Sequence, residues 1–381
     1  MSTYNRAQLK YANSILPSLS IQEAQEKQFK LVDRMSRHFK GRQFLSMGDL
    51  GVSPTYKRPE QTYLVERVLA DFFETEDCAL VRGAGTGAIR NILSMLLSPG
   101  DEMFIHTAPV YTTTKETLRI LGIKTVQADY NHLEEIRTAI RTNQNPKVFY
   151  IQHARQQPAD HYQLAEVIKA VKEERPDLPI VVDDNYCALK TKGIGVELGA
   201  DYSTFSGFKL LGPEGIAVIA GKKDAIERVH HYNYSGGGQV QGYEAMELLR
   251  MMTFAPVSLA IQNEQVEELC RRLNEGAVNG IFAAYMTNAQ SKNVIVELED
   301  PIAQSVISIS DEHGAATHPV GAESKYEIIP MIYRVSGSFL EAQPELKDYG
   351  LRINPMKSGA NTIIGILEKV IPLAKEVQHH R

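Results

Sequence analysis

Asp201-Tyr202-Ser203-Thr204-Phe205-Ser206-Gly207-Phe208-Lys209 is a short strand pattern that runs into a lysine. The residues that follow, Leu210-Leu211-Gly212-Pro213-Glu214-Gly215, are mostly small or apolar. An amine among such neighbours at a strand end loses hydration, which lowers its pKa and frees it for carbonyl chemistry. A solvated surface lysine is the usual alternative, and these neighbours argue against it. The sequence therefore predicts a reactive amine at Lys209.

A second strand pattern, Ile180-Val181-Val182-Asp183-Asp184-Asn185-Tyr186, stops on a carboxylate 26 residues before Lys209. In a parallel sheet the carboxyl ends of the strands face the ligand crevice, so we expect Asp183 to point where a ligand binds. Acidic and amide residues after a strand are also ordinary loop and helix-cap material. Taken alone, Asp183 leaves both interpretations open.

A glycine-rich turn, Arg82-Gly83-Ala84-Gly85-Thr86-Gly87-Ala88, lies between a strand pattern and a helix pattern. Glycines allow close backbone approach, and free N–H groups at a helix start suit a phosphate. Gly83, Gly85 and Ala88 also satisfy the dinucleotide fingerprint, which requires an acidic residue at the end of the next strand. That strand ends instead at His106-Thr107-Ala108-Pro109. A turn that merely needs glycine remains the third interpretation.

Short apolar runs alternate with amphipathic helical segments up to about residue 220, which predicts an α/β fold with a mainly parallel sheet between helical layers. The predicted strands are residues 78–81, 102–106, 123–128, 148–152, 180–182, 202–205 and 217–220. We expect an N-terminal helical arm at 1–50, a large domain at 51–255 and a small α+β domain at 256–381. Long helical patterns cover 21–39, 61–73 and 243–273.

The composition excludes several classes of protein. With 41 basic and 46 acidic residues among 381 and 43% hydrophobic residues, the chain is neither disordered nor a polycationic nucleic-acid binder. Cys78, Cys187 and Cys270 are too scattered for a disulfide framework or a zinc ribbon, and the histidines form no metal-binding pattern. No apolar run reaches the roughly 20 residues that span a bilayer. We expect a cytoplasmic protein without a metal.

Together, the glycine loop, Asp183, and Ser206 followed by Lys209 supply what pyridoxal 5′-phosphate (PLP) needs, namely phosphate donors, a carboxylate for the ring nitrogen and an amine for the aldehyde. The sequence resembles the fold-type-I PLP enzymes, and specifically the cystathionine synthase and lyase group of Cys/Met metabolism, from about Tyr56 to the C-terminus. The resemblance implies an aminotransferase-like three-layer large domain and a homodimer or tetramer. It assigns Lys209 as the Schiff-base lysine, Asp183 as the partner of the ring nitrogen, and Gly85, Thr86 and Ser206 as phosphate ligands.

Further positions carry roles by resemblance. Tyr111 matches the aromatic residue that stacks on the cofactor ring, and core packing is its alternative. Tyr56 and Arg58 match a Tyr-x-Arg pair that reaches the phosphate of a neighbouring subunit. Their alternative is that both are loop residues without a role in the site. Arg352, in Leu351-Arg352-Ile353-Asn354, matches the arginine that binds the substrate carboxylate. Arg334 competes with Arg352 for that role.

One segment departs from the family, because Gln152-His153-Ala154-Arg155-Gln156-Gln157-Pro158 stands where the group carries Glu-Ser/Thr-x-x-Asn-Pro. His153 is either a ligand-facing base or a satisfied loop histidine, and Arg155 is either a second carboxylate contact or a solvated arginine. We therefore expect an enzyme acting on a small amino acid, first as a lyase or γ-replacement enzyme and second as an aminotransferase. A dinucleotide-dependent oxidoreductase and a PLP-binding sensor without turnover are the remaining alternatives.

Overall fold

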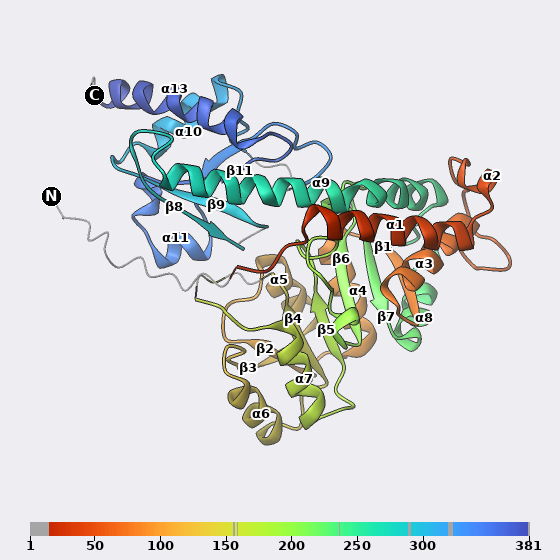
Figure 1. The fold of residues 1–381 in the computed structure, drawn as a ribbon. Helices are drawn as coiled ribbons and strands as arrows, with labels where there is room; N and C mark the ends of the chain where they lie inside the picture. Colours follow the sequence, from red (N-terminus) through yellow and green to blue (C-terminus); the bar gives the residue numbers. More distant parts are fainter. Residues whose placement is uncertain are drawn as a thin grey trace.

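The computed structural model describes residues 15–154, 157, 159–235, 237–288, 291–318 and 323–379. Within these residues the larger of two sheets has seven strands in the order β1-β7-β6-β5-β4-β2-β3 (Figure 1). The strands are β1 (Asp77–Arg82), β2 (Glu102–His106), β3 (Lys124–Ala128), β4 (Val148–Gln152), β5 (Ile180–Asp183), β6 (Tyr202–Ser206) and β7 (Ile216–Gly221). All seven predicted strands are present, with ends shifted by at most a few residues.

The large sheet is mainly parallel, as predicted. The neighbouring pairs from β3 to β6 are parallel, and only β7 runs against both of its neighbours, β1 and β6. Parallel neighbours need a crossover of a dozen or more residues, whereas the link from β6 to β7 is short. That link contains the 3₁₀ turn η3 (Phe208–Leu210), which carries Lys209 at the carboxyl end of β6.

Helices cover both faces of this sheet, which gives the predicted three layers. One face packs against α4 (Ala84–Leu96), α5 (Thr112–Leu121) and α8 (Lys223–Tyr232). The other packs against α6 (Leu133–Thr142), α7 (Leu164–Glu174), α1 (Ile21–His38), α3 (Glu60–Phe73) and α9 (Gly242–Asn274). In β5, Val181 is buried in the first of these cores and Val182 in the second. Alternate side chains thus fill opposite layers, as a strand buried on both faces requires.

The long helix α9 runs from the large sheet to the second sheet, and α1 lies along its first half (Figure 1). Ser20 caps α1 and forms a capping box with Glu23, which explains why this helix begins at Ile21. The short helix α2 (Gly41–Phe44) follows α1. The three long helices predicted from periodicity, α1, α3 and α9, are therefore present.

The second sheet, in the described part of the chain, has four antiparallel strands in the order β10-β11-β9-β8. They are β8 (Ile281–Thr287), β9 (Asn293–Leu298), β10 (Met331–Arg334) and β11 (Gly350–Asn354). One face of the sheet packs on the end of α9, on α10 (Ala303–Glu312) and on α13 (Ala360–His379), and two short helices, α11 (Ser338–Ala342) and α12 (Leu346–Tyr349), follow β10. The sequence did not suggest β8, an edge strand whose burial does not alternate regularly.

The predicted boundary between residues 255 and 256 falls inside α9, so the division into domains stays a prediction. Among the described residues, no helix is long and apolar enough to cross a membrane. The same residues contain no cluster of three or more His, Cys, Asp or Glu side chains that could hold a metal ion. The three cysteines are buried and unpaired.

Candidate active site

Asp183 is the last residue of β5, and its side chain is buried at the carboxyl end of the sheet. Its Oδ1 accepts hydrogen bonds from the backbone N (3.0 Å) and the Nδ2 (2.7 Å) of Asn185, and its Oδ2 accepts one from the Tyr150 hydroxyl (3.2 Å). Burial raises the pKa of Asp183, whereas the Asn185 hydrogen bonds and the charge of Lys209 lower it. The carboxylate and the amine therefore lie close enough to influence each other's ionisation.

Lys209 lies in η3, between the ends of β6 and β7. Its Nζ is 3.7 Å from the centroid of the Tyr186 ring. Burial lowers the pKa of Lys209 to about 8, although the charges of Asp183 and Glu323 oppose the shift. A substantial fraction of the amine is therefore uncharged near neutral pH, as its small and apolar neighbours predict.

The glycine-rich loop forms the start of α4. The N–H groups of Gly83 and Ala84 donate to the carbonyl of Gly215, and helix geometry leaves those of Gly85 and Thr86 without a carbonyl four residues earlier. A Cβ atom on Gly85 would overlap the side-chain amide of Asn185, so a larger residue there would displace that amide. This turn thus presents two amides at a helix N-terminus, which is a suitable place for a phosphate.

Hydroxyl groups flank the glycine loop. The Thr86 hydroxyl lies 2.9 Å from the Thr113 hydroxyl at the start of α5. Ser206, the last residue of β6, is buried, and its Oγ has no hydrogen-bond partner among the described residues. A buried hydroxyl without a partner is costly, and a phosphate oxygen would satisfy it. The donors present at this end of the sheet therefore fit the phosphate of PLP.

Tyr111 is the residue immediately before α5, and 41% of its surface is exposed. Burial raises the pKa of Tyr186, and the Tyr111 phenol raises it further. Tyr186 itself has a left-handed backbone with a φ of 68°, a conformation that is strained for a residue with a side chain. Tyr111 is thus an accessible aromatic ring beside the residue that contacts Lys209, and the predicted stacking on the cofactor stays a prediction.

Arg352 is a buried cation on β11, and only 1% of its surface is exposed. One of its guanidinium nitrogens donates to the carbonyl of Ser336 (3.3 Å), while its Nε has no partner among the described residues. The rings of Tyr333 and Phe339 lie about 6 Å from it. Since no carboxylate from the described residues pairs with this buried arginine, an external carboxylate is favoured as its ligand. Arg334 is exposed, so burial favours Arg352 over it.

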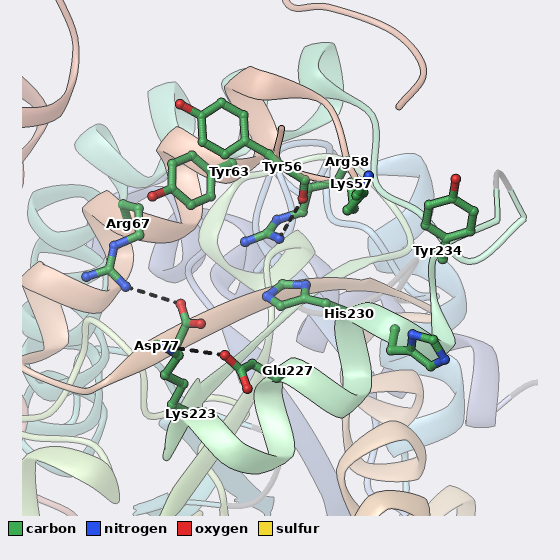
Figure 2. A pocket seen from close by; sticks show the side chains of 11 residues that line it. Tyr56, Lys57, Arg58, Tyr63, Arg67, Asp77, Lys223, Glu227, His230 and Tyr234 are labelled. Carbon is green, nitrogen blue, oxygen red and sulfur yellow. Dashed lines mark hydrogen bonds and ion pairs between the residues drawn. The ribbon is translucent and has the colours of Figure 1, made fainter. Parts of the chain in front are cut away.

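The structure does not bring Tyr56 and Arg58 to Lys209 of the same chain. They line a separate cavity of about 680 Å³ between α3 and α8, shown in Figure 2. Its lining also includes Lys57, Tyr63, Arg67, Asp77, Lys223, Glu227, His230, His231 and Tyr234. Arg58 pairs with the buried Glu66 (Nε–Oε2, 2.5 Å), and the Tyr56 ring stacks on Tyr63 at 4.1 Å. Their predicted role in a neighbouring subunit stays a prediction.

The departing segment after β4 contains one well-defined contact. His153 is buried, and its Nδ1 lies 2.7 Å from Oδ1 of Asp184, whose Oδ2 accepts the N–H of Gly195. His153 is therefore a hydrogen-bonded histidine held by a buried carboxylate, which favours the satisfied-histidine interpretation. Arg155 lies outside the described residues.

Other site residues had no signal in the sequence. Lys190 and Glu323 form a buried ion pair that also contacts Ser291 and Gln262, although the pair is separated by 133 residues. The charges of both Lys190 and Glu323 act on Lys209. In the sequence, the only signal for a role of Asn185 is its position two residues after Asp183.

The chain belongs to the Cys/Met metabolism PLP-dependent enzymes, whose family model matches residues 54–291. Residues 267–367 match a second family model, the C-terminal domain of YhfS-like proteins. This confirms the predicted family and, with it, the expectation of a PLP-dependent chain. It favours PLP over the dinucleotide interpretation of Gly83, Gly85 and Ala88.

Among individual proteins, the chain is 47% identical over 356 residues to the "uncharacterized protein YhfS" of Escherichia coli (strain K12), covering 93% of this chain and 98% of that protein. It is also similar to the crystal structure of the pyridoxal-5′-phosphate-dependent protein YhfS from Escherichia coli, with a TM-score of 0.92, 46% identity, and coverage of 95% and 99% of the two chains. Cystathionine γ-synthase from Xanthomonas oryzae pv. oryzae shares the fold, with a TM-score of 0.70, 15% identity, and coverage of 92% and 98%. The predicted three-layer fold with an additional C-terminal domain is thereby confirmed.

Proposed function

We propose that this chain is a PLP-dependent enzyme that acts on a small amino acid, most closely as a lyase or γ-replacement enzyme of Cys/Met metabolism. The observation that carries the proposal is the buried Lys209 amine at the strand-end site, whose pKa burial lowers and whose charge acts on the carboxylate of Asp183. Two buried polar atoms without a hydrogen-bond partner in the described chain also support it. Ser206 Oγ suits the phosphate of the cofactor, and Arg352 Nε suits the carboxylate of the substrate.

Each of these residues has a distinct task in the proposed reaction. Lys209 would be the amine that joins the aldehyde of PLP, and as a free amine it would accept the Cα proton of the substrate. Asp183 keeps the ring nitrogen protonated. Ser206, Gly85 and Thr86 hold the phosphate. PLP, when bound, supplies an electron sink that acidifies the Cα–H bond.

Arg352 binds the substrate carboxylate and thereby fixes the orientation of the Cα–H bond relative to Lys209. The guanidinium is already buried, so it loses little hydration when a carboxylate arrives, and it donates two parallel hydrogen bonds. In elimination or replacement, the leaving group on the substrate side chain needs a proton. Tyr111, exposed beside Tyr186, is our candidate donor.

The proposal includes a homodimer or tetramer in which Tyr56 and Arg58 serve the phosphate site of a neighbour. Mixing subunits tests this directly. A Lys209→Ala subunit supplies Arg58 but no reactive amine, whereas an Arg58→Ala subunit supplies the amine of Lys209 but no arginine at position 58. Mixed oligomers are expected to bind PLP more tightly than Arg58→Ala alone. Affinity equal to that of Arg58→Ala alone would place Arg58 outside the neighbour's site.

The decisive experiment is borohydride reduction of the PLP-loaded protein followed by peptide mapping. We expect a pyridoxyl group on Lys209 and none in Lys209→Ala, while Lys192→Ala, which changes an exposed lysine, labels normally. An adduct elsewhere would refute the assignment. An amino-acid panel then separates the reactions, since ammonia with a keto acid indicates elimination, whereas accumulation of pyridoxamine phosphate indicates transamination.

A further inference from the structure

Asn185 connects three strand ends of the candidate site. Its backbone N–H and side-chain Nδ2 both donate to Oδ1 of Asp183. Its side-chain Oδ1 accepts the backbone N–H of Ser206 at the end of β6 (2.9 Å). The same amide lies against Gly85, where even a methyl group would overlap it at 2.4 Å. One side chain therefore touches the carboxylate, the hydroxyl-bearing strand and the glycine loop.

In the side-chain amide of Asn185, the nitrogen acts as a hydrogen-bond donor and the oxygen as an acceptor. The amide nitrogen can only donate, so it suits a carboxylate at Asp183, and the amide oxygen can only accept, so it suits the N–H of Ser206. Hydrogen bonds donated to a carboxylate stabilise its charged form, and burial of Asp183 works in the opposite direction. Within the described residues Asn185 thus supplies two of the three hydrogen bonds that this buried carboxylate accepts, and both favour its charged form.

The position of Asn185 also affects the distance between the Asp183 carboxylate and the phosphate donors, which must match the distance between the ring nitrogen and the phosphate of the cofactor. The Asp183 carboxylate faces the ring nitrogen in the proposed function, and Ser206 with the glycine loop faces the phosphate. Because Asn185 contacts both sets, a shift of its amide moves the carboxylate relative to the phosphate donors. Groups that orient the ligands of a bound metal in this way typically change metal affinity or activity by about 10–100-fold when mutated, and we expect a change of the same order here.

We propose that Asn185 is a positioning residue that keeps Asp183 charged and fixes its distance from the phosphate loop. The inference rests on the proposed function, since it assumes that Asp183 faces the cofactor ring nitrogen. It goes beyond that function by assigning the ring-nitrogen charge state to a residue that acts through Asp183.

Asn185→Asp is the sharpest variant, because it retains an acceptor for Ser206, replaces the side-chain donor to Asp183 and, when ionised, places a second negative charge beside that carboxylate. We expect apo-protein carrying this change to bind PLP about 10–100-fold more weakly than wild type at pH 8. At pH 8 the two adjacent carboxylates repel each other and displace Asp183, so the ¹⁵N chemical shift of ring-labelled PLP is expected to depart from that of a protonated nitrogen paired with Asp183. Protonation is expected to recover as pH falls, because the introduced carboxyl group, once protonated, donates a hydrogen bond as the amide does.

The chain offers a matched control at the end of β3. Asn131 donates to Oδ1 of Asp129 through its backbone N (2.9 Å) and its Nδ2 (2.9 Å), and its Oδ1 accepts the backbone N–H of His161 (2.7 Å). Asn131→Asp therefore makes the same chemical change in the same local geometry, away from the residues assigned to the cofactor. We expect it to bind PLP within about twofold of wild type and to keep the ring nitrogen protonated at every pH tested.

The outcomes separate this inference from the proposed function. A wild-type protein that shows no pyridoxyl adduct on Lys209 refutes the proposed function itself. If wild type shows the adduct and Asn185→Asp binds PLP and protonates the ring as wild type does, the positioning role is wrong. Equal losses in Asn185→Asp and Asn131→Asp would also overturn it, because both would then reflect the structure of the loops. Thermal unfolding of the apo-proteins checks that each variant folds.

Discussion

The Nζ of Lys209 lies 3.7 Å above the centre of the Tyr186 ring, and Tyr186 holds that place with a left-handed backbone. The negative face of an aromatic ring attracts a cation, so the ring stabilises the charged amine against the effect of burial. It also gives the end of a long, flexible side chain a defined position. The residue that orients the predicted reactive amine, Tyr186, thus has a strained backbone.

Replacing the Tyr186 ring is expected to lower the pKa of Lys209. A cation–π contact of about 0.5–2 kcal/mol corresponds to roughly 0.4–1.5 pH units. Tyr186→Leu should therefore shift the pH dependence of Lys209 acylation in apo-protein from a midpoint of about 8 to a lower one. Tyr186→Phe keeps the ring and the same backbone strain, so it is expected to retain the wild-type midpoint. Equal midpoints for Leu and wild type would show that the ring does not stabilise the charge.

The two neighbouring carboxylates after β5 are expected to differ sharply in function. Asp183→Asn should retain covalently bound PLP and lose about 100-fold or more in turnover, because the electrostatic partner of the ring nitrogen is removed. Asp184 binds His153 and the Gly195 amide instead, so Asp184→Asn should lower the melting temperature and keep turnover within about tenfold. Steady-state rates and thermal melts distinguish them. The reverse pattern would transfer the role to Asp184.

Binding of the substrate carboxylate is expected to require Arg352 but not Arg334. Arg352→Lys keeps the charge and removes the two-pronged geometry, so the KM for the amino acid should rise about 10–100-fold, as expected for the loss of about 1.5–3 kcal/mol. PLP affinity should stay within about twofold. Arg334→Lys, which makes the same change at an exposed position on β10, serves as the control and should leave KM unchanged. An increase in KM in the control alone would exchange the two assignments.

We expect a specific pH dependence of stability from the buried Glu66, which pairs with Arg58 at the cavity between α3 and α8. Burial raises the pKa of Glu66 to about 7, although Arg58 and the Leu80 amide lower it. A carboxyl group with a higher pKa in the folded protein binds more protons when folded. Its contribution to stability is therefore present below about pH 4.5 and is lost as pH rises towards 7.

Glu66→Gln is expected to remove that part of the pH dependence, on the order of 3 kcal/mol between pH 4.5 and 7. Urea unfolding at several pH values measures it. Glu227→Gln, which changes an exposed glutamate lining the same cavity (Figure 2), is expected to keep the wild-type slope. If Glu66→Gln also keeps that slope, the carboxylate of Glu66 is already charged in the folded protein at low pH.

Local sequence patterns were reliable where one strand or helix determines the outcome. The β-branched run before Asp183 predicted a strand that ends on that carboxylate, and β5 ends there. Periodicity predicted α9 to within one residue at each end. The strand β8 was missed because its side chains do not alternate between buried and exposed, so its sequence lacks the period of two that identifies a strand.

The sequence by itself determined the order of chemical groups along the chain: a glycine turn before a helix, a carboxylate at one strand end and a lysine after another. Those features depend on local backbone preference and on alternation, which neighbouring residues encode. Which of these groups meet depends on the packing of the whole chain. Packing paired Lys190 with Glu323, placed Tyr186 under Lys209, and paired Arg58, which lines a separate cavity, with the buried Glu66. Such contacts follow from how strands and helices pack together, and residues far apart in sequence carry no local pattern that reveals them.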